Sequence, residues 1–308
     1  MAFIPVVDGK TQMAELGSPD IWSPKLLVKF YSACVAGNIT NTDYEGVISK
    51  QGCKVIIRTT PDVQIRPYTK GMVLTHQQLA PGREELDIDK ANYWDFVIDN
   101  IDAFQGDINY QNDWTNDAAF QQKVATDVDM LGGVYASAHA SNKGAAAGLK
   151  SGDINLGVAG TPLQFTNVNA IDIITSIRTV LCEQNIPETD CAIVLPYWAT
   201  QRIKTSDIKD AMLTGDKVSP LRNGRIGKID DFEIYGSNLL TSVVDGSGVN
   251  AWQAIACHKS AISFAAQMTQ NQVLPQVEST FGAVCRGLLV YGYKVLKPQA
   301  LVNLYLRK

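Results

Sequence analysis

The sequence predicts an α+β fold, and three observations support this prediction. Residues 50–102 alternate between apolar and charged side chains with the two-residue period of a β-strand. A later segment, residues 115–141, repeats apolar side chains at helical spacing. Beyond residue 160, short apolar runs, helical patterns and turn signals follow one another. We therefore expect long antiparallel strands, one long helix and a mixed α/β region.

The composition is that of an ordinary folded protein. The chain has 308 residues, of which 45% are hydrophobic and 19% charged, so it is long enough for two subdomains or one elongated body with extensions. The net charge of -4 argues against a dedicated nucleic-acid-binding protein, although a shell that encloses DNA remains compatible with it. Six scattered cysteines without a C-x-x-C pair are typical of buried thiols in a reducing cytoplasm. We expect no signal peptide at the N-terminus and no membrane-spanning stretch.

Residues 50–102 predict one long hairpin whose arms carry opposite charge. The outbound arm, residues 50–70, has five basic residues and one acid, whereas the return arm, residues 84–102, has seven acids and one base. Opposite charges across an antiparallel pair favour one register, so we expect the arms to pair at the base while the tip, residues 71–82, reaches a neighbour.

A two-stranded hairpin is marginally stable alone, so its apolar face needs a second surface to cover it. Where the rest of the chain does not cover it, a neighbouring subunit must. The predicted intersubunit contacts are the charged side chains of Arg58, Arg66, Lys70, Glu84, Glu85 and Asp87.

The remaining elements of the first half are an arm, two helices and a loop. Residues 1–21 predict an extended arm, and a short helix is expected from Ser23 to Gly37. The long helix begins at Thr115 or Asn116, with an apolar stripe of Phe120, Val124, Val128, Leu131, Tyr135 and Ala138. Gly132 and Gly133 predict a bend or a close approach of another backbone. Residues 143–160, rich in Gly and Ala, predict a mobile loop.

The second half predicts two further helices and a series of strands. One helix is capped by Asn169 and ends before Pro187, and another covers residues 197–211. Turns are expected at Asn223-Gly224 and Asp245-Gly246. The predicted strands are 191–195, 225–235, 249–257, 261–267, 288–295 and 300–306.

No catalytic, cofactor-binding or metal-binding residue is predicted. The three histidines, His76, His139 and His258, lie in different elements, and neighbours such as Cys257 and His258 point to opposite faces of a strand. Residues 144–151 resemble a phosphate loop, but the lysine is misplaced and no strand precedes it. A soluble enzyme that depends on Cys257 remains the alternative from a different functional class.

The order of elements, together with three segments, resembles the major capsid protein of tailed bacteriophages. The segments are Ile226–Leu240, a strand ending in a Ser-Asn turn; Ala254–Ala265, a strand re-entering the peripheral domain; and Phe281–Leu306, the long terminal strands. This family has the Hong Kong ninety-seven-type fold, and the chain is most similar to its Salmonella-podophage coat branch. The chain departs from relatives that carry a telokin-like insertion or a long N-terminal scaffold segment. Lys70 and Asn271 lie in regions where the type member forms a covalent crosslink, but we assign none.

The resemblance implies a phage major-capsid fold with four parts. These are an N-terminal arm and short helix (1–46), an extended β-hairpin loop (47–104), a peripheral domain with a long spine helix (105–152 and 259–298), and an axial α/β domain (153–258 and 299–308).

The resemblance also implies a function. The expected protein is a structural, non-enzymatic subunit that forms pentamers and hexamers of itself, in an icosahedral shell around double-stranded DNA. Its expected partners are a scaffolding protein, a portal and a decoration protein, with no cofactor and no membrane. It would be assembled in the bacterial host cytoplasm and located in the virion capsid. An encapsulin-like shell of a bacterial nanocompartment is the alternative within the same fold.

Overall fold

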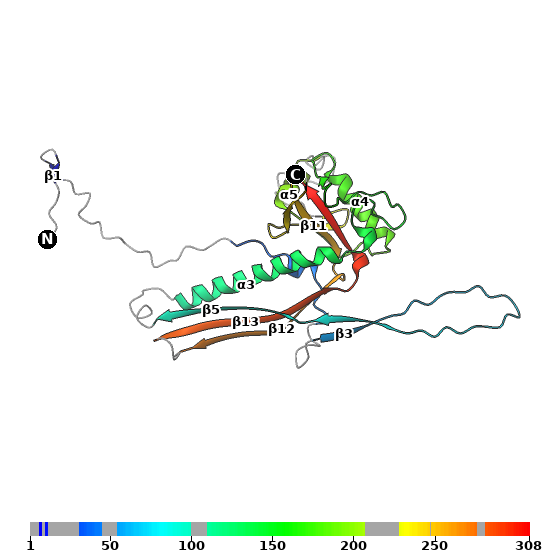
Figure 1. Cartoon of the computed structure of the whole chain (residues 1–308), viewed down its shortest axis with the longest axis horizontal. Helices are drawn as coiled ribbons and strands as arrows, with labels where there is room; N and C mark the ends of the chain where they lie inside the picture. Colours follow the sequence, from blue (N-terminus) through cyan, green and yellow to red (C-terminus); the bar gives the residue numbers. More distant parts are fainter. Residues whose placement is uncertain are drawn as a thin grey trace.

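The computed structural model describes residues 6–7, 10–11, 31–44, 54–99, 110–206, 228–246, 248–275 and 281–308. Long strands and one long helix form an elongated body, a compact α/β lobe lies at one end of that helix, and a hairpin projects past the lobe (Figure 1). Near the N-terminus, β1 (Val6–Val7) pairs with β2 (Lys10–Thr11). None of the helices in the described part of the chain combines the length and the apolar composition that a membrane span requires.

The elongated body is an antiparallel sheet with a helix on one face. The strand order is β12 (Ile262–Leu274), β13 (Gly282–Val295), β5 (Lys90–Asp99), and α3 (Tyr110–Val134) lies along the sheet (Figure 1). The alternation in β5 sets its faces: Phe96 packs edge-on against Trp114 of α3, whereas Tyr93 is 76% exposed on the opposite face. The predicted strand period is thereby confirmed for β5.

The hairpin is formed by β3 (Lys54–Thr59) and β4 (Gly82–Asp87), with Lys54 opposite Asp87 and Thr59 opposite Gly82. Its return arm is therefore residues 72–87, and the predicted return arm of 84–102 is wrong beyond Asp87. Residues 90–99 pair with β13 instead. The error has a physical cause, because strand alternation defines which face a residue occupies but not which strand lies beside it.

The α/β lobe is built on a sheet with the strand order β6-β14-β11-β7-β9-β8, and β10 also pairs with β11. Two helices, α4 (Ala170–Glu183) and α5 (Tyr197–Lys204), belong to the same lobe. The strand bounds are Leu163–Gln164 (β6), Cys191–Leu195 (β7), Lys228–Ile229 (β8), Phe232–Gly236 (β9), Ser242–Val244 (β10), Asn250–His258 (β11) and Leu301–Arg307 (β14).

Strand β7 is buried on both faces, as expected for a strand paired in parallel inside an α/β layer. Cys191, Ile193 and Leu195 pack into the core that contains the buried side chains of α4 and α5. Ala192 and Val194 pack on the other side, against α1 (Ala36–Ile39) and the C-terminal part of α3. The end of α3 therefore connects the elongated body to the lobe.

The two helices of the first half differ from their predictions. Residues 23–30 of the predicted short helix lie outside the described residues, residues 31–35 are not helical, and α1 covers only Ala36–Ile39. The long helix begins at Tyr110, earlier than predicted, and continues past Val134 into the 3-10 helix η3 (Tyr135–Ser137). Leu131 and Ala138 of its predicted stripe are buried, but Phe120 and Val128 are about half exposed. The covered face carries polar residues instead, including Gln122, Thr126 and Asp129, which bond to other parts of the chain or to α3 itself.

The predictions for the second half are mostly confirmed. Helix α4 and strand β7 form where expected, and α5 ends at Lys204, with residues 207–211 outside the described part. The turn Asn223-Gly224 also lies outside it, whereas the turn at Asp245 is present and separates β10 from β11. The predicted strand 225–235 is interrupted at Asp230 and Asp231, both with positive φ. Strands β12 and β13 are longer than predicted.

Candidate subunit-contact surfaces

The root of the hairpin contains part of the predicted charge pairing. Lys54 Nζ lies 2.5 Å from Glu85 Oε2 and 3.4 Å from Asp87 Oδ1. The hydrogen bond between Lys54 and Glu85 raises the pKa of the lysine and lowers the pKa of the glutamate. Basic and acidic arms therefore do pair at the base, as the sequence predicts, through these three residues.

The other predicted charge contacts differ. Arg58 stands directly opposite Arg83, a like-charge pair, and no ion pair of Arg58 occurs among the described residues. Glu84 turns away from the hairpin and pairs with Lys294 of β13 at 3.0 Å. Arg66 donates to Thr75 Oγ1 at 2.6 Å, and Lys70 is exposed beside the turn. Arg83 was missed, because it lies one residue before the acidic run.

The chain itself covers the apolar face of the hairpin root. Leu86, Ile88 and Ala265 form a small buried core, which partly buried Tyr44, Val55, Ile57 and Val290 border. Gly292 of β13 lies so close to this root that an added Cβ would be 2.1 Å from the carbonyl oxygen of Asp87. The chain therefore covers the root itself, and the expected cover by a neighbouring subunit applies only to the part of the hairpin beyond the root.

The part of the hairpin beyond the strands, residues 60–81, keeps the same register. Gln77 receives a hydrogen bond from Gln64 N and donates one to Gln64 O, and Met72 N donates to Thr69 O at the tip. This segment projects away from the body (Figure 1). Ile65 is 92% exposed and Val73 85% exposed, and further exposed apolar side chains are Val63, Tyr68, Met72, Leu74 and Leu79. So many exposed apolar side chains on one segment mark an interaction surface.

A polar cluster fastens α3 to the sheet. Lys90 Nζ donates to both carboxylate oxygens of Asp129, at 2.7 and 2.8 Å, and to Tyr293 Oη at 2.9 Å. Tyr293 Oη donates to the carbonyl oxygen of Asp129, and Tyr291 Oη donates to its carboxylate. Burial lowers the pKa of Lys90, but the hydrogen bonds to Asp129 and Tyr293 outweigh burial and raise it. Gly133 permits this contact, since its Cβ would lie 2.5 Å from Tyr293 Oη, so the predicted close approach is made by a side chain.

Residues 31–36 lie along α3 as a strap. Tyr31 stacks on Phe120 and donates a hydrogen bond to Asp117. Further along, the buried carboxylate of Asp127 accepts the backbone N–H groups of Val35 and Ala36 at 2.6 and 3.2 Å. Burial raises the pKa of Asp127, although these backbone hydrogen bonds oppose the shift. Nothing in the sequence pattern marks Asp127, and only the position of the strap shows its role.

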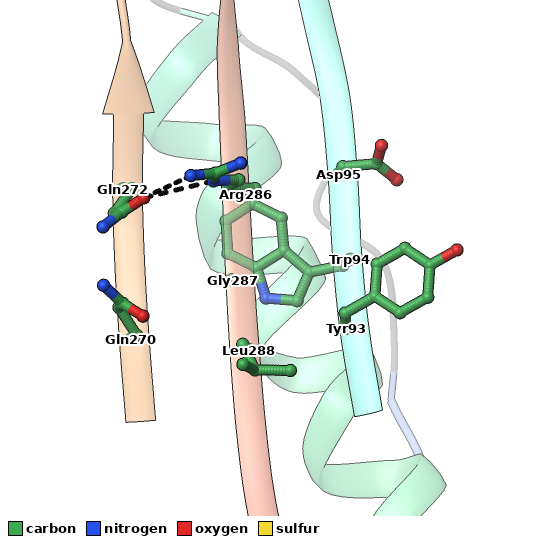
Figure 2. A pocket seen from close by; sticks show the side chains of 8 residues that line it. All are labelled: Tyr93, Trp94, Asp95, Gln270, Gln272, Arg286, Gly287 and Leu288. Atoms are coloured by element: carbon green, nitrogen blue, oxygen red, sulfur yellow. Dashed lines mark hydrogen bonds between the residues drawn. The ribbon is translucent and has the colours of Figure 1, made fainter. Parts of the chain in front are cut away.

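The sheet face opposite α3 contains a shallow groove of about 420 Å³. Figure 2 shows its lining side chains, which come from all three strands. Arg286 donates two hydrogen bonds to Gln272 Oε1, at 2.7 and 3.2 Å. The lining residues are Tyr93, Trp94, Asp95, Gln270, Gln272, Arg286, Gly287 and Leu288. The groove is open and carries no nucleophile paired with a base.

The residues considered for catalysis are not brought together. Cys257 is fully buried, which raises its pKa to about 12 and keeps the thiol protonated at neutral pH. His258 bonds to Ser260 instead, and burial lowers the pKa of its ring. In the phosphate-like loop, the N–H groups of Lys150 and Ser151 donate to the carboxylate of Glu183. Among the described residues, no group of His, Cys, Asp and Glu side chains could hold a metal ion.

Comparison with known proteins identifies the fold. No protein-family model and no curated protein matches the sequence. Among solved structures, a chain from Mycobacterium phage Che8 has a TM-score of 0.74 and 25% identity, over 92% of this chain and 96% of that one. The capsid structure of cyanophage P-SCSP1u has a TM-score of 0.73 and 14% identity, and each chain is covered completely. The mature capsid of bacteriophage PhiM1 has a TM-score of 0.67 and 14% identity, over 94% of this chain and 91% of that one. The predicted α+β class is confirmed, and the fold of this chain is that of bacteriophage capsid structures.

Proposed function

We propose that this chain is a structural subunit that assembles with copies of itself into the capsid shell of a bacteriophage. The observation that carries the proposal is the projecting hairpin segment 60–81, whose large apolar side chains are 45% to 92% exposed. The shared fold with phage capsid structures supports it.

The hairpin is anchored so that it can contact a neighbouring subunit as a rigid extension of the body. The hairpin is anchored at its root by the Lys54 ion pairs and the Leu86 core, and α3 is fastened to the sheet by Lys90 and Asp129. A rigid body therefore presents the apolar segment to a neighbouring copy, where burial supplies affinity and charged side chains supply register. Arg58, which stands opposite Arg83, would gain an acidic partner from that neighbour, whereas Arg83 already lies 4.0 Å from Glu85.

The finer proposal follows the resemblance of the sequence. The subunits form pentamers and hexamers of an icosahedral shell of the Hong Kong ninety-seven type, similar to the Salmonella-podophage branch, around double-stranded DNA. In this proposal, residues 153–258 and 299–308 form the axial domain, 105–152 and 259–298 the peripheral domain, and 1–46 the N-terminal arm. Residues 47–104 form the extended loop, of which 90–99 lie in the three-stranded sheet beside β13. A scaffolding protein, a portal and a decoration protein are the proposed partners, with assembly in the host cytoplasm and residence in the virion.

The proposed role involves no catalysis. Cys257 is a buried thiol, and His258 faces away from it to bond with Ser260. Cys257 does not line the groove of Figure 2, and the groove's lining residues include no nucleophile paired with a base. The groove therefore does not support an enzyme that depends on Cys257.

The test is the assembly state of the expressed protein, with and without a scaffolding partner, by light scattering and electron microscopy. Closed shells are expected, and only small monodisperse species under every condition would overturn the proposal. Particles that contain packaged DNA support the viral role, whereas shells filled with a protein cargo would replace it with the nanocompartment role.

A further inference from the structure

The outer edge of the three-stranded sheet is open along most of β12. Within the part of the chain that the structure describes, one edge of β12 pairs with β13, and the backbone pairing found on the other edge is that of Asn41 with Ile262 and Phe264. A bulge between Ala266 and Met268 separates this covered end from the rest. Beyond it, residues 268–274 continue in regular register as an edge of ~24 Å.

Apart from its bulge, this edge lacks the charges and prolines that usually protect an edge strand from pairing with another chain. Residues 262–274 include no Lys, Arg, Asp, Glu or Pro, and their sequence is Ile-Ser-Phe-Ala-Ala-Gln-Met-Thr-Gln-Asn-Gln-Val-Leu. The opposite edge of the same sheet, β5, carries Lys90, Asp95 and Asp99. Exposed edge strands are normally blunted by charges, prolines or bulges, because unpaired backbone groups recruit other strands. Beyond its bulge, β12 is therefore built to accept a strand.

The side chain of Gln272 on this edge is held in one orientation as a hydrogen-bond donor. Arg286 holds Gln272 through its carbonyl oxygen, so the side-chain NH₂ group of Gln272 is turned away from β13. Figure 2 shows the side-chain nitrogens of Gln270 and Gln272 on the side of β12 that faces away from β13. An amide fixed at its oxygen leaves two N–H groups for a partner across the edge.

We propose that β12 pairs antiparallel with β12 of a second copy of this chain, about a two-fold axis at Asn271. This register places Asn271 opposite its own copy and Gln270 opposite Gln272 of the second copy, so the preset amide of Gln272 donates to Gln270. A symmetric pair sets each strand against itself, and a charged strand would meet like charge. The neutral sequence of β12 fits this partner, whereas the hairpin segment 62–66 would bring the charges of Asp62 and Arg66 to a neutral edge.

The pairing joins two sheets into one continuous sheet and brings the two grooves of Figure 2 side by side. Seven residue pairs bury far less than the ~1,000 Å² of a stable interface, so the contact is weak between isolated copies. In an assembly, other contacts raise the effective concentration of the two edges, and the pairing then becomes populated. The extent to which the β12 pairing is populated thus rests on the proposed shell, whereas the register of the pairing does not depend on it.

Single cysteines test the symmetry of the pair, since only a two-fold contact links a residue to itself. The variants N271C and Y93C are made in a background with Cys34, Cys53 and Cys182 changed to serine, and assembled protein is oxidised and run on a non-reducing gel. N271C should give at least tenfold more covalent dimer than Y93C, which lies on the charged strand of the same sheet. Mixed particles of Q270C and Q272C should crosslink more than either variant alone. An absence of dimer from N271C would overturn the proposal.

Charge exchange gives a second, independent readout. The variants Q270K/Q272K and Q270E/Q272E should each weaken the contact, because like charges then stand opposite one another, and a 1:1 mixture should restore it. Equal behaviour of the mixture and the single variants would contradict symmetric pairing. Shells that form without N271C crosslinks would remove this pairing and leave the proposed function intact. Crosslinked dimers of N271C that form at high concentration, without any shells, would support this pairing and overturn the proposed function.

Discussion

Arg58 and Arg83 stand directly opposite each other in the β3–β4 ladder. Like charges at opposed positions destabilise an antiparallel pair, so this position costs the isolated hairpin stability. In the proposed shell, an acidic group of a neighbouring subunit would remove that cost. The opposed arginines are therefore unfavourable in the single folded chain and become favourable in the proposed assembly.

The variant R58E should impair assembly while leaving the single chain at least as stable as the wild type. The introduced carboxylate would face Arg83 as an opposite charge, a gain of about 0.5 kcal/mol in the hairpin. The measurements are particle yield by electron microscopy and unfolding midpoint under non-assembling conditions. The double variant R58E/R66E should lower particle yield further. A collapse of monomer stability that matches the loss of assembly would contradict the role in subunit contact.

The matched charge control is K54E. This change places a glutamate beside Glu85 and Asp87 and removes the ion pairs at the root of the hairpin. It should lower the stability of the hairpin in the single chain, measured as faster backbone hydrogen exchange in residues 54–87. If K54E and R58E behaved alike, the distinction between root and contact residues would be lost.

Polar substitution of the most exposed apolar residues of the hairpin should block assembly without unfolding the chain. The variant I65D/V73D replaces side chains that are 92% and 85% exposed, so its unfolding free energy should change by less than about 0.5 kcal/mol. Light scattering should show loss of large particles. V168D, at a similarly exposed valine in the lobe, is the control, and equal loss of particles there would mean that added charge alone prevents assembly.

The strap along α3 should depend on the acceptor atoms of Asp127 and not on its charge. D127N keeps an oxygen for the N–H groups of Val35 and Ala36, whereas D127A leaves them unpaired and should cost about 1–3 kcal/mol of unfolding free energy. The raised pKa of Asp127 in the folded state means that its protonated form favours folding, and this contribution is lost as pH rises from about 3.8 through the folded pKa.

The stability of D127N relative to wild type should therefore increase with pH across that interval and then level off. Chemical unfolding between pH 3.5 and pH 7 measures the difference. The opposite slope, with D127N losing stability relative to wild type as pH rises, would mean that the ionised carboxylate stabilises the strap.

The root of the hairpin should not tolerate a side chain at residue 292. An alanine there would place its Cβ 2.1 Å from the carbonyl oxygen of Asp87, so the hairpin backbone must shift away from β13. We expect a loss of about 1–3 kcal/mol in unfolding free energy for G292A. G37A, where an added Cβ meets nothing within 4 Å, is the matched control and should be neutral or stabilising. An unchanged unfolding free energy for G292A would show that the close contact between residue 292 and Asp87 does not contribute to stability.

Local pattern predicted the elements better than their partners. The alternation of residues 86–98 and the run at 191–195 located strands correctly, because burial on one or both faces is visible in the order of side chains. The partner of β5 was missed, since the alternation of β5 does not show whether β3 or β13 lies beside it, and the choice depends on contacts distant in sequence. The covered face of α3 was missed because hydrogen-bonding residues such as Gln122 and Asp129 occupy it.

The contact surfaces were only partly predictable for related reasons. Charge segregation correctly indicated the pairing of Lys54 with Glu85 and Asp87, but register decided that Arg58 meets Arg83. Asp127 gave no signal, because an acid on a helix becomes a buried acceptor only when another segment crosses it. The open edge of β12 is visible in the sequence as a long neutral run, but only the sheet order shows that this run lies at an edge.

Strand β14 lies between β6 and β11 in the sheet of the lobe, although it comes late in the chain. A ribosome finishes the hairpin, with its exposed apolar side chains, about 10–40 s before it reaches β14, at ordinary rates of synthesis. During that interval the sheet lacks an inner strand, and the lobe cannot close around its core. The late strand therefore sets an order: a nascent chain exposes the apolar side chains of residues 60–81 before its lobe can fold around β14.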